Sequence, residues 1–505
     1  MSRMPELTRE WARDRVIVRA LTVAAFVVVL NETIMVNAIP RLMEVLDVSA
    51  RAAQWLSTGF MLTMAVVIPV TGWFLQRVTT RAAFATAMGL FVSGTLLAAV
   101  APGFEVLLAG RVIQAAGTAV MFPLLMTTVM TVVPVERRGA TMGNVSLVMA
   151  VAPALGPALS GVVLQVASWR WLFGLVLPIA VLVGLIGLKV LTNVGETRPG
   201  RLDLFSVLLT ALGFGALVYG LSQLGGEVEG PVHPVTALVV GVLGVAVFAW
   251  HQWRLQRGST PLLDLRVLSH RVYLVGLGML SLGFMALMGA GILLPIYLQQ
   301  VRGLSVLEAG LMVMPGGLAM GLLGPRVGRW YDRLGARRLA VPGAVVVTLT
   351  MGAMTAATQV APVWVFLALH LVLSVGLALV FTPVFSFALG SLPAGLYPHG
   401  SAMLGTIQQV AAAAGTALVI TVMATRAAQL AQGAVPGPEA IGGGVQLALV
   451  VSTVLTLAVL GLSLLSPGRP GEPEDDLDRE LDELLEHEEL PAEVAGDGQL
   501  ATEPC

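Results

Sequence analysis

One acidic residue stands inside an otherwise apolar stretch near the start of the chain. The stretch runs from about Val16 to Ile39, is long enough to cross a bilayer, and contains Glu32. A carboxylate there costs at least about 2.5 kcal/mol unless it is neutralised, paired or hydrated, so such an acid is a functional candidate. The alternative is a structural role, in which Glu32 joins helices through hydrogen bonds. Because no other acid before the tail lies well inside a span, we predict that Glu32 is a proton-binding site.

A cation is expected at the same depth as Glu32. Glu32 lies about seven residues, or roughly 10 Å, before the end of its span, and Arg111 lies about six residues, or roughly 9 Å, beyond Glu105 at the start of the fourth. These depths permit a hydrogen bond or an ion pair, direct or through water. Gln114 lies one turn on and shares the face of Arg111. Alternatively, Arg111 braces helix ends through backbone carbonyls.

The composition is that of a polytopic membrane protein. Of the 505 residues, 56% are hydrophobic and 12% are charged, about half the charged share of a soluble protein. The 30 acids include 14 from Glu472 onward, so the first 471 residues hold 30 − 14 = 16 acids against 29 − 1 = 28 basic residues. Cys505 is the only cysteine, which excludes an intramolecular disulfide and a thiolate metal cluster. We expect no metal and no cofactor.

Fourteen apolar runs of about 20 residues predict an all-α protein with 14 transmembrane helices. The expected spans are 16–39, 53–74, 82–101, 104–126, 139–165, 171–191, 204–224, 235–253, 272–298, 305–327, 339–357, 363–386, 400–425 and 445–465. If the amino terminus is cytoplasmic, the cytoplasmic segments hold 23 of the 29 basic residues and the outer segments hold 5. This bias predicts that both termini are cytoplasmic.

An internal repeat divides the chain into halves. Glycine, a polar residue and two arginines recur at the same offsets in 72–81, between spans 2 and 3, and in 328–337, between spans 10 and 11. Repeated halves around a site at the middle of the membrane are typical of secondary transporters. The predicted domains are a cytoplasmic segment (1–15), a six-helix bundle (16–192), a linker with two inserted helices (193–254), a cytoplasmic loop (255–271), a second six-helix bundle (272–466) and an acidic tail (467–505).

Several motifs, in order along the chain, resemble those of the major facilitator superfamily. The resemblance is carried by Leu30–Pro40, Gly72–Arg81, Leu107–Gly117, Ala154–Gly161, Ser168–Phe173 and Gly328–Arg338. Together they look like a fourteen-helix member of the drug:proton antiporter branch. The resemblance implies the major-facilitator-type fold, two six-helix bundles plus two inserted helices, and a substrate path between the bundles.

The first motif departs from the family pattern. The usual aspartate of helix 1 falls on Asn31, and the carboxylate is displaced by one residue to Glu32. One residue is about 100° of helix rotation. Whether Asn31 or Glu32 points into the cavity stays open at this stage. The first loop motif departs as well, because Gln76 replaces the usual aspartate, so we expect the second half to carry most of the cytoplasmic charge latch.

The resemblance also implies a set of conformational residues. Gly156, Pro157 and Gly161 correspond to the motif at which the halves meet and move, and their types alone predict a kinked, tightly packed helix. The expected latch residues are Gly72, Arg77, Arg81, Gly328, Asp332, Arg333 and Arg337. The arginines are also explained by simple anchoring on the cytoplasmic side. Asp332 is the informative member, because anchoring has no use for an acid.

Further polar residues are candidates for the substrate cavity. They are Asn31, Asn37, Gln54, Gln114, Tyr297, Gln408 and Gln409. Each of them is also explained as a residue that joins helices or lies at the membrane interface. His370 could titrate near neutral pH, but a lone histidine in an apolar helix is weak support for a site.

These observations predict a proton-coupled antiporter that exports lipophilic or drug-like small molecules across a bacterial-type plasma membrane. The expected partners are the substrate and membrane lipid, with no nucleic acid. An exporter of an endogenous lipid, metabolite or antibiotic would use the same coupling. A polytopic membrane enzyme is the third interpretation, but no loop carries clustered His, Asp and Glu residues or a close Ser/His pair.

Overall fold

The computed structural model describes residues 4–36, 38–195, 197, 200–224, 232–257, 261–358, 361–433 and 435–468. This part of the chain is helical and contains 14 helices that are long and apolar enough to cross a membrane, as the hydropathy pattern predicts. They are α1 (Met4–Val36), α3 (Ala50–Arg77), α4 (Thr80–Ala99), α5 (Phe104–Val132), α6 (Arg138–Val166), α7 (Arg170–Val190), α8 (Leu204–Gln223), α9 (Pro234–Leu255), α10 (Arg271–Ile296), α11 (Val306–Leu334), α12 (Arg337–Ala357), α13 (Val363–Gly390), α14 (Tyr397–Gln432) and α15 (Gly437–Ser463).

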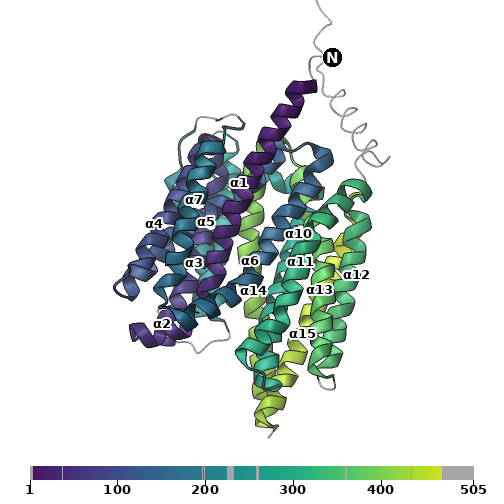
Figure 1. The fold of residues 1–505 in the computed structure, drawn as a ribbon. Helices are drawn as coiled ribbons and strands as arrows, with labels where there is room; N and C mark the ends of the chain where they lie inside the picture. The colour runs from purple at the N-terminus through teal and green to yellow at the C-terminus, as the bar shows by residue number, and fades with distance from the viewer. Residues whose placement is uncertain are drawn as a thin grey trace, which may run out of the picture.

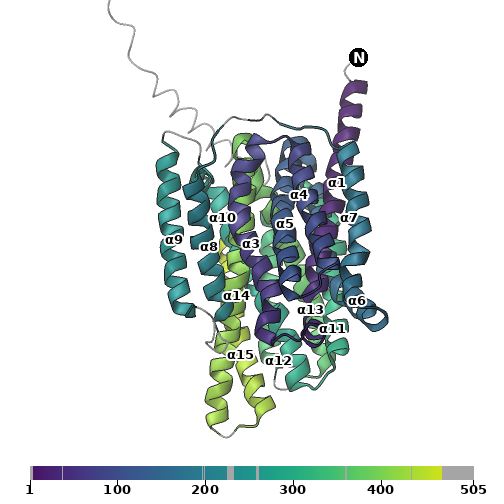
Figure 2. The ribbon, with the colours of Figure 1, turned by 90° about the vertical axis from the view of Figure 1, so that its left-hand side faces the viewer.

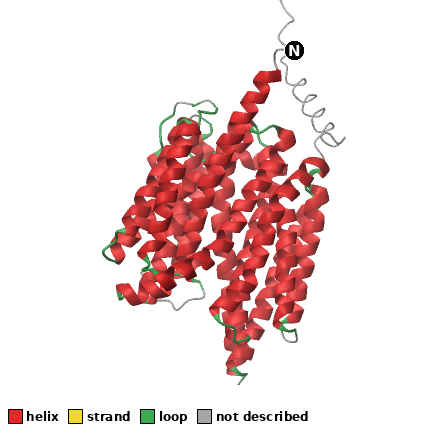
Figure 3. Ribbon diagram, viewed as in Figure 1, coloured by secondary structure: helices red, strands yellow, loops and turns green. Residues whose placement is uncertain are grey.

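The helices form two groups that stand side by side (Figure 1). In the first, α4 packs on α5 and α7, and α1 packs on α5, α6 and α7; in the second, α12 packs on α13 and α15, and α14 packs on α10 and α15. We call the end at which α1 begins, at the top of Figure 1, the basic face, because it carries Arg77, Arg138 and Arg337. The other end is called the opposite face. Figure 3 shows helices throughout the described part, joined by short loops.

Local sequence signals set the helix ends. Ser49 and Thr79 cap α3 and α4 by accepting hydrogen bonds from the backbone N–H three residues on. Ser305 and Glu308 form a capping box at the start of α11. These caps satisfy backbone groups that a helix leaves unpaired at its first turn, so each helix starts at a defined residue.

The first predicted span ends earlier than its apolar run. We expected a helix to Ile39, but α1 ends at Val36 and a separate short helix, α2 (Ile39–Leu46), follows. Proline in the first turn of α2 and the buried Leu42 favour this second start, because proline is accepted at a helix beginning but interrupts a helix interior. Glu32 therefore lies only about one turn from the end of its helix.

The inserted helices α8 and α9 pack at the edge of the molecule (Figure 2). Helix α8 contacts α3 of the first group and α14 of the second, whereas α9 packs mainly on α8. On the basic face, Asp203 caps α8 and lies 2.6 Å from His251 of α9. The amide of Gln252 binds the hydroxyl of Ser206 and accepts backbone hydrogen bonds from the loop that leads to α10. The insert is thus tied to both groups.

The two groups contact each other mainly along the basic-face half of the molecule. Helices α6 and α11 touch from Gly139 and Gly328 near the basic face to Ala154 and Gly317 near the middle. Farther toward the opposite face, a Cβ atom on Gly161 of α6 or on Gly310 of α11 would meet nothing within 4 Å. At these two glycines the helices are therefore not in contact.

Candidate functional site

Arg111 lies buried in the first group, with 1% of its surface exposed. Its guanidinium stands 4.2 Å from the ring centroid of Phe60, on α3. One nitrogen, Nη1, donates a 2.6 Å hydrogen bond to Gln114 Oε1 and a long one of 3.4 Å to Asn31 Oδ1. Within the described residues, the guanidinium Nε has no partner. The contacts join α1, α3 and α5 around one cation.

Gln114 is held from its other end by α4. Its Nε2 donates a 2.7 Å hydrogen bond to Thr95 Oγ1, and both side chains are fully buried. Beside this bond, a Cβ atom on Gly94 would lie 2.5 Å from the backbone nitrogen of Gln114. Only a glycine permits the backbones of α4 and α5 to approach so closely. The Thr95–Gln114–Arg111 chain is therefore fixed by backbone packing.

The structure separates the roles of Asn31 and Glu32. Asn31, which aligns in sequence with the usual aspartate of helix 1, is 2% exposed and accepts the long hydrogen bond from Arg111. Glu32 is partly exposed, has no hydrogen bond or ion pair with the described residues, and interacts with the charge of Arg111 through space. The rotation of about 100° per residue accounts for the difference. The carboxylate is thus near the cation without being locked to it.

Thr33 connects the site to the Gly-Pro motif of α6. Its hydroxyl lies 3.4 Å from the carbonyl oxygen of Ala152, and a Cβ atom on Gly156 would overlap the Thr33 side chain. Pro157, within α6, is exposed. Helix α6 therefore packs directly beside Glu32 at its middle and against α11 at its beginning.

The other predicted cavity residues do not gather around Arg111. Gln54 is exposed on α3, and Gln408 is partly exposed on α14. Gln409 reaches across the two groups, with Nε2 3.4 Å from the sulfur of Met64. Asn37 lies outside the described residues.

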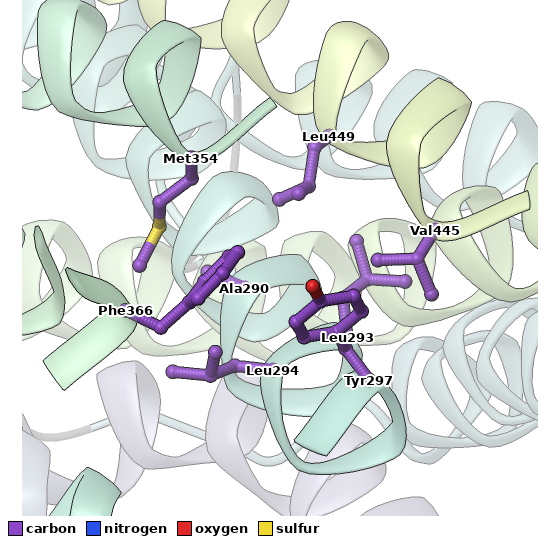
Figure 4. Close-up of a pocket in the computed structure, with 8 residues that line it drawn as sticks. All are labelled: Ala290, Leu293, Leu294, Tyr297, Met354, Phe366, Val445 and Leu449. Atoms are coloured by element: carbon purple, nitrogen blue, oxygen red, sulfur yellow. The ribbon is translucent and has the colours of Figure 1, made fainter. Parts of the chain in front are cut away.

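Tyr297 does not line the path between the groups as we expected. It is 1% exposed inside the second group, where its hydroxyl donates a 2.6 Å hydrogen bond to the carbonyl of Thr358. Its ring packs on Phe366 and borders a cavity of about 10 Å³ lined mainly by apolar side chains (Figure 4). A cavity of that size holds about one water molecule, so it cannot take a drug-sized substrate.

Asp332 links the two groups at the basic face. Its carboxylate oxygens accept hydrogen bonds of 2.7 and 2.8 Å from the backbone N–H groups of Gly139 and Ala140, at the start of α6. An acid at this place satisfies unpaired backbone donors and the positive end of the helix dipole. Beside it, a Cβ atom on Gly328 would overlap the Gly139 backbone. Arg333 is exposed.

The corresponding contact of the first half is weaker. Gln76 of α3 donates one 3.0 Å hydrogen bond to the carbonyl of Gly395, before α14. Arg77 bonds within its own helix to the carbonyl of Trp73, and its charge lies 4.8 Å from that ring. Gly72 lies against the buried His399 of α14.

The remaining expected latch residues make local contacts. The backbone of Arg81 bonds to Asn193, and the backbone of Arg337 bonds to Pro467. Both side chains are exposed, as expected of arginines that anchor the basic face.

Four contributors were missed from the sequence: Phe60, Thr95, Thr33 and His399. Threonine and phenylalanine are common in apolar helices, so their types carry no signal, although Thr33 stands inside the motif Leu30–Pro40. His399 carried a weak one, because it is a titratable residue directly before residues 400–405, whose glycines and methionine partly repeat the pattern of 139–143 at the start of α6.

Sequence comparison assigns most of the chain to one family. The Major Facilitator Superfamily profile matches residues 21–416. The uncharacterised MFS-type transporter YcnB of Bacillus subtilis is 38% identical over 460 residues, which are 90% of this chain and 96% of that protein. The lincomycin resistance protein LmrB of Listeria innocua is 36% identical over 453 residues, covering 88% and 95%. The multidrug export protein EmrB of Haemophilus influenzae is 30% identical over 402 residues, covering 79% and 78%.

Solved structures share the fold at low sequence identity. The human organic anion transporter MFSD10 superposes with a TM-score of 0.64 and 15% identity, covering 89% of this chain and 99% of that one. The proton:xylose symporter XylE gives 0.60 and 14%, covering 90% and 96%. The expected fold is therefore confirmed, and an enzyme is excluded by the family assignment. The chain belongs to the major facilitator superfamily and is an integral, multi-pass membrane transporter.

Proposed function

We propose that this transporter is a proton-coupled antiporter that exports lipophilic or drug-like small molecules, with Glu32 as the proton carrier and Arg111 as its partner. Relatives named for lincomycin resistance and multidrug export, each aligned over more than three quarters of this chain, support export of drug-like compounds. The basic face would be cytoplasmic and both termini would lie there, because the predicted segments on that side hold most of the arginines.

The observation that carries the coupling is the unequal bonding around Arg111. Its hydrogen bonds go to the neutral side chains of Asn31 and Gln114, whereas the carboxylate of Glu32, close enough to feel the charge of Arg111, makes no hydrogen bond with the described residues. A carboxylate that is not locked in a salt bridge can gain and lose a proton without breaking the surrounding network. Arg111 would then favour the ionised form of Glu32, and a cationic or polar substrate would compete for it.

Helix α6 would transmit the protonation state of Glu32 to the other half. It touches Thr33, next to Glu32, through Gly156, and it is capped at the basic face by Asp332 of α11. A small movement of α1 against α6 would thus act on the contact that closes the basic face. Gly156, Pro157, Gly161 and the loop-motif residues would serve this movement, and Asp332 would be the principal latch.

The test is to measure protons released when substrate binds to the purified protein, and proton-driven uptake of ethidium or lincomycin into inverted liposomes. Glu32→Gln should abolish both while leaving the fold intact, because the amide keeps the volume but cannot ionise. Asn31→Ala is the matched control beside it and should weaken transport without removing proton release. Full coupling in Glu32→Gln would exclude this mechanism. A substrate screen that finds one lipid or metabolite instead of many drugs would favour an endogenous exporter.

A further inference from the structure

The second half contains a buried histidine at the place that corresponds to Arg111. His370 lies seven residues after the start of α13 at Val363, as Arg111 lies seven after the start of α5 at Phe104. The helices that these two residues contact also correspond. His370 packs on Gly316, ten residues into α11, and Arg111 packs on Phe60, ten residues into α3.

The loop motifs fix this correspondence independently. Gly72 stands 22 residues after the first residue of α3, and Gly328 stands 22 residues after the first residue of α11. The register of α3 against α11 therefore does not depend on the site itself. Phe60 and Gly316 are equivalent positions, and the side chain that Gly316 lacks leaves the space that the imidazole fills.

The imidazole is buried, and only one of its two nitrogens has a hydrogen-bond partner. His370 is 9% exposed, and a Cβ atom on Gly316 would lie 2.5 Å from its Nε2. The ring bonds to the backbone carbonyl of Val313, and Nδ1 has no partner among the described residues, so Nε2 is the donor. Nδ1 is then the nitrogen that carries the lone pair, and although it is buried it can accept a proton.

Charged groups on the surrounding helices lie near the membrane faces, and none of those described acts on this imidazole. Helices α6, α10, α11, α12 and α14 pack against α13. Their titratable and charged residues are, on α6, Arg138; on α10, Arg271 and Tyr273; on α11, Glu308, Arg326, Arg329, Tyr331, Asp332 and Arg333; on α12, Arg337 and Arg338; and on α14, Tyr397, His399 and Arg426.

An imidazolium in this packing would be an unpaired buried charge with one unsatisfied N–H group. Both features are costly in an apolar interior. Protonation of His370 is therefore compatible only with an arrangement in which α13 moves away from Gly316 and Nδ1 reaches water or an acceptor. A ligand that binds one of two conformations shifts the population toward it, and here the ligand is a proton.

We propose that His370 is a second proton-binding residue, placed in the half opposite Glu32, and that its protonation favours separation of α11 from α13 at Gly316. The inference rests on the proposed proton-coupled transport and assigns a titrating group to the second half. Imidazole suits this role because its ordinary pKa lies close to neutral pH. A proton from water at the opened site binds Nδ1, and the same proton leaves when the helices close.

The direct test follows the protonation of His370 itself. Full-length protein carrying ¹³C-labelled histidine is titrated by NMR from pH 5 to pH 9, with and without ethidium, and the His370 signal is assigned by its loss in His370→Gln. We expect that signal to titrate, and its midpoint to shift when the transported compound saturates the protein. A His370 signal that stays unchanged over the whole range in both conditions would overturn the proposal, whatever Glu32 does.

A functional measurement separates this inference from the proposed function. Below about pH 7, His370→Gln should release fewer protons per bound substrate than the wild type, by up to one, because the amide can still donate to Val313 but cannot ionise. His233→Gln, at the exposed start of α9, is the matched control and should leave the count unchanged. Equal counts and pH profiles for His370→Gln and the wild type would refute the second site, whereas loss of coupling in Glu32→Gln tests the first. If His370→Gln does not fold, the NMR signal of His370 can be assigned in two other ways. One is its loss in His370→Asn, and the other is its persistence when the other five of the six histidines are replaced.

Discussion

The two contacts that join the halves at the basic face are built from equivalent helices but differ in strength. Between α6 and α11, the carboxylate of Asp332 accepts two backbone hydrogen bonds across the halves, and Gly139 and Gly328 bring the backbones together. Between α3 and α14, Gln76 donates one hydrogen bond, and Gly72 faces the imidazole of His399.

The difference predicts that one of the two equivalent contacts contributes more than the other to holding the halves together. A carboxylate on two helix N–H groups gains from both the hydrogen bonds and the helix dipole, whereas a neutral amide on one carbonyl gains one ordinary hydrogen bond. The closed basic face should therefore depend mainly on α6 and α11. The contact of α3 with α14 should act as a secondary clamp, tied to the insert through His399 and the loop before α10.

The largest loss of the closed arrangement of the basic face is expected from Gly328→Ala. The new Cβ atom would overlap the Gly139 backbone, and backbone cannot yield as a flexible side chain can. Overpacking of this kind costs about 1–3 kcal/mol, which lowers the closed population by about 5- to 150-fold. Spin labels at Val135 and Leu334, in a Cys505→Ser background, should report a longer distance by pulsed EPR, and export should slow.

The matched control for this change is Gly310→Ala, on the same helix as Gly328. This glycine also lies within a long helix, but a Cβ atom there meets nothing within 4 Å. It should leave the distance between the labels and the export rate unchanged. Equal effects of the two alanines would mean that the α6–α11 crossing is not what closes the basic face.

Asp332→Ala should have the next largest effect. It removes a helix cap that accepts two backbone hydrogen bonds, and loss of such a cap costs about 1–2 kcal/mol. The same label pair should show a closed fraction lowered by roughly 5- to 30-fold. Arg333→Ala, an exposed neighbour, serves as the control, and a larger effect there would assign the latch to the arginine.

Gln76→Ala should have a smaller effect than Asp332→Ala. It removes one neutral hydrogen bond, worth at most about 1 kcal/mol. Gln76→Asp sharpens the comparison, because an acid restored at this position would face the carbonyl of Gly395 and should not strengthen the clamp. Labels on α3 and α14 measure both variants, and a closed fraction that rises with the acid would contradict the geometry.

The smallest change in the α3–α14 contact is expected from Asp264→Asn. Asp264 lies in the loop before α10, and its backbone N–H donates a hydrogen bond to His399. Burial by itself raises the pKa of Asp264, but hydrogen bonds with Arg266 outweigh it and leave the pKa below its ordinary value. An acid with a lowered pKa stabilises the folded state above its ordinary pKa of about 4, and this contribution is lost only as the pH falls through the folded value. Arg266 is largely exposed although the Asp264 side chain is only 3% exposed. Because asparagine keeps an oxygen that can accept the hydrogen bonds of Arg266, we expect a smaller change in the α3–α14 distance than in Gln76→Ala.

The pH dependence of the α3–α14 distance tests whether Asp264 stays ionised. The α3–α14 distance in the wild type should show no step from Asp264 between pH 5 and pH 8. A step in that range that disappears in Asp264→Asn would show that the carboxylate titrates there, and that the bonds to Arg266 do not hold it ionised.

Much of the architecture could be predicted from the sequence, because hydropathy and charge act locally along a chain. Fourteen apolar runs predict the fourteen spans, and the repeated loop motif pairs α3 with α11. Glu32 was predicted by elimination and Arg111 from its matching depth, since a charge inside an apolar run is conspicuous in any conformation; their roles in transport stay predictions. Asp332 was singled out as an acid with no anchoring role, and the structure places it on the start of α6; its role as a latch stays a prediction.

The tertiary structure decided which neighbours those residues have. One residue of helix rotation places Asn31 on Arg111 and leaves Glu32 free, and no pattern of residue types determines that rotation. Thr95, Phe60 and Thr33 contribute through contacts between helices, and Tyr297 faces the interior of its own half. The residue types of this chain thus determine which segments can enter the membrane and where a charge is unusual. Helix rotation and helix crossing determine which residues those charges contact, because both depend on packing between segments that are distant in the sequence.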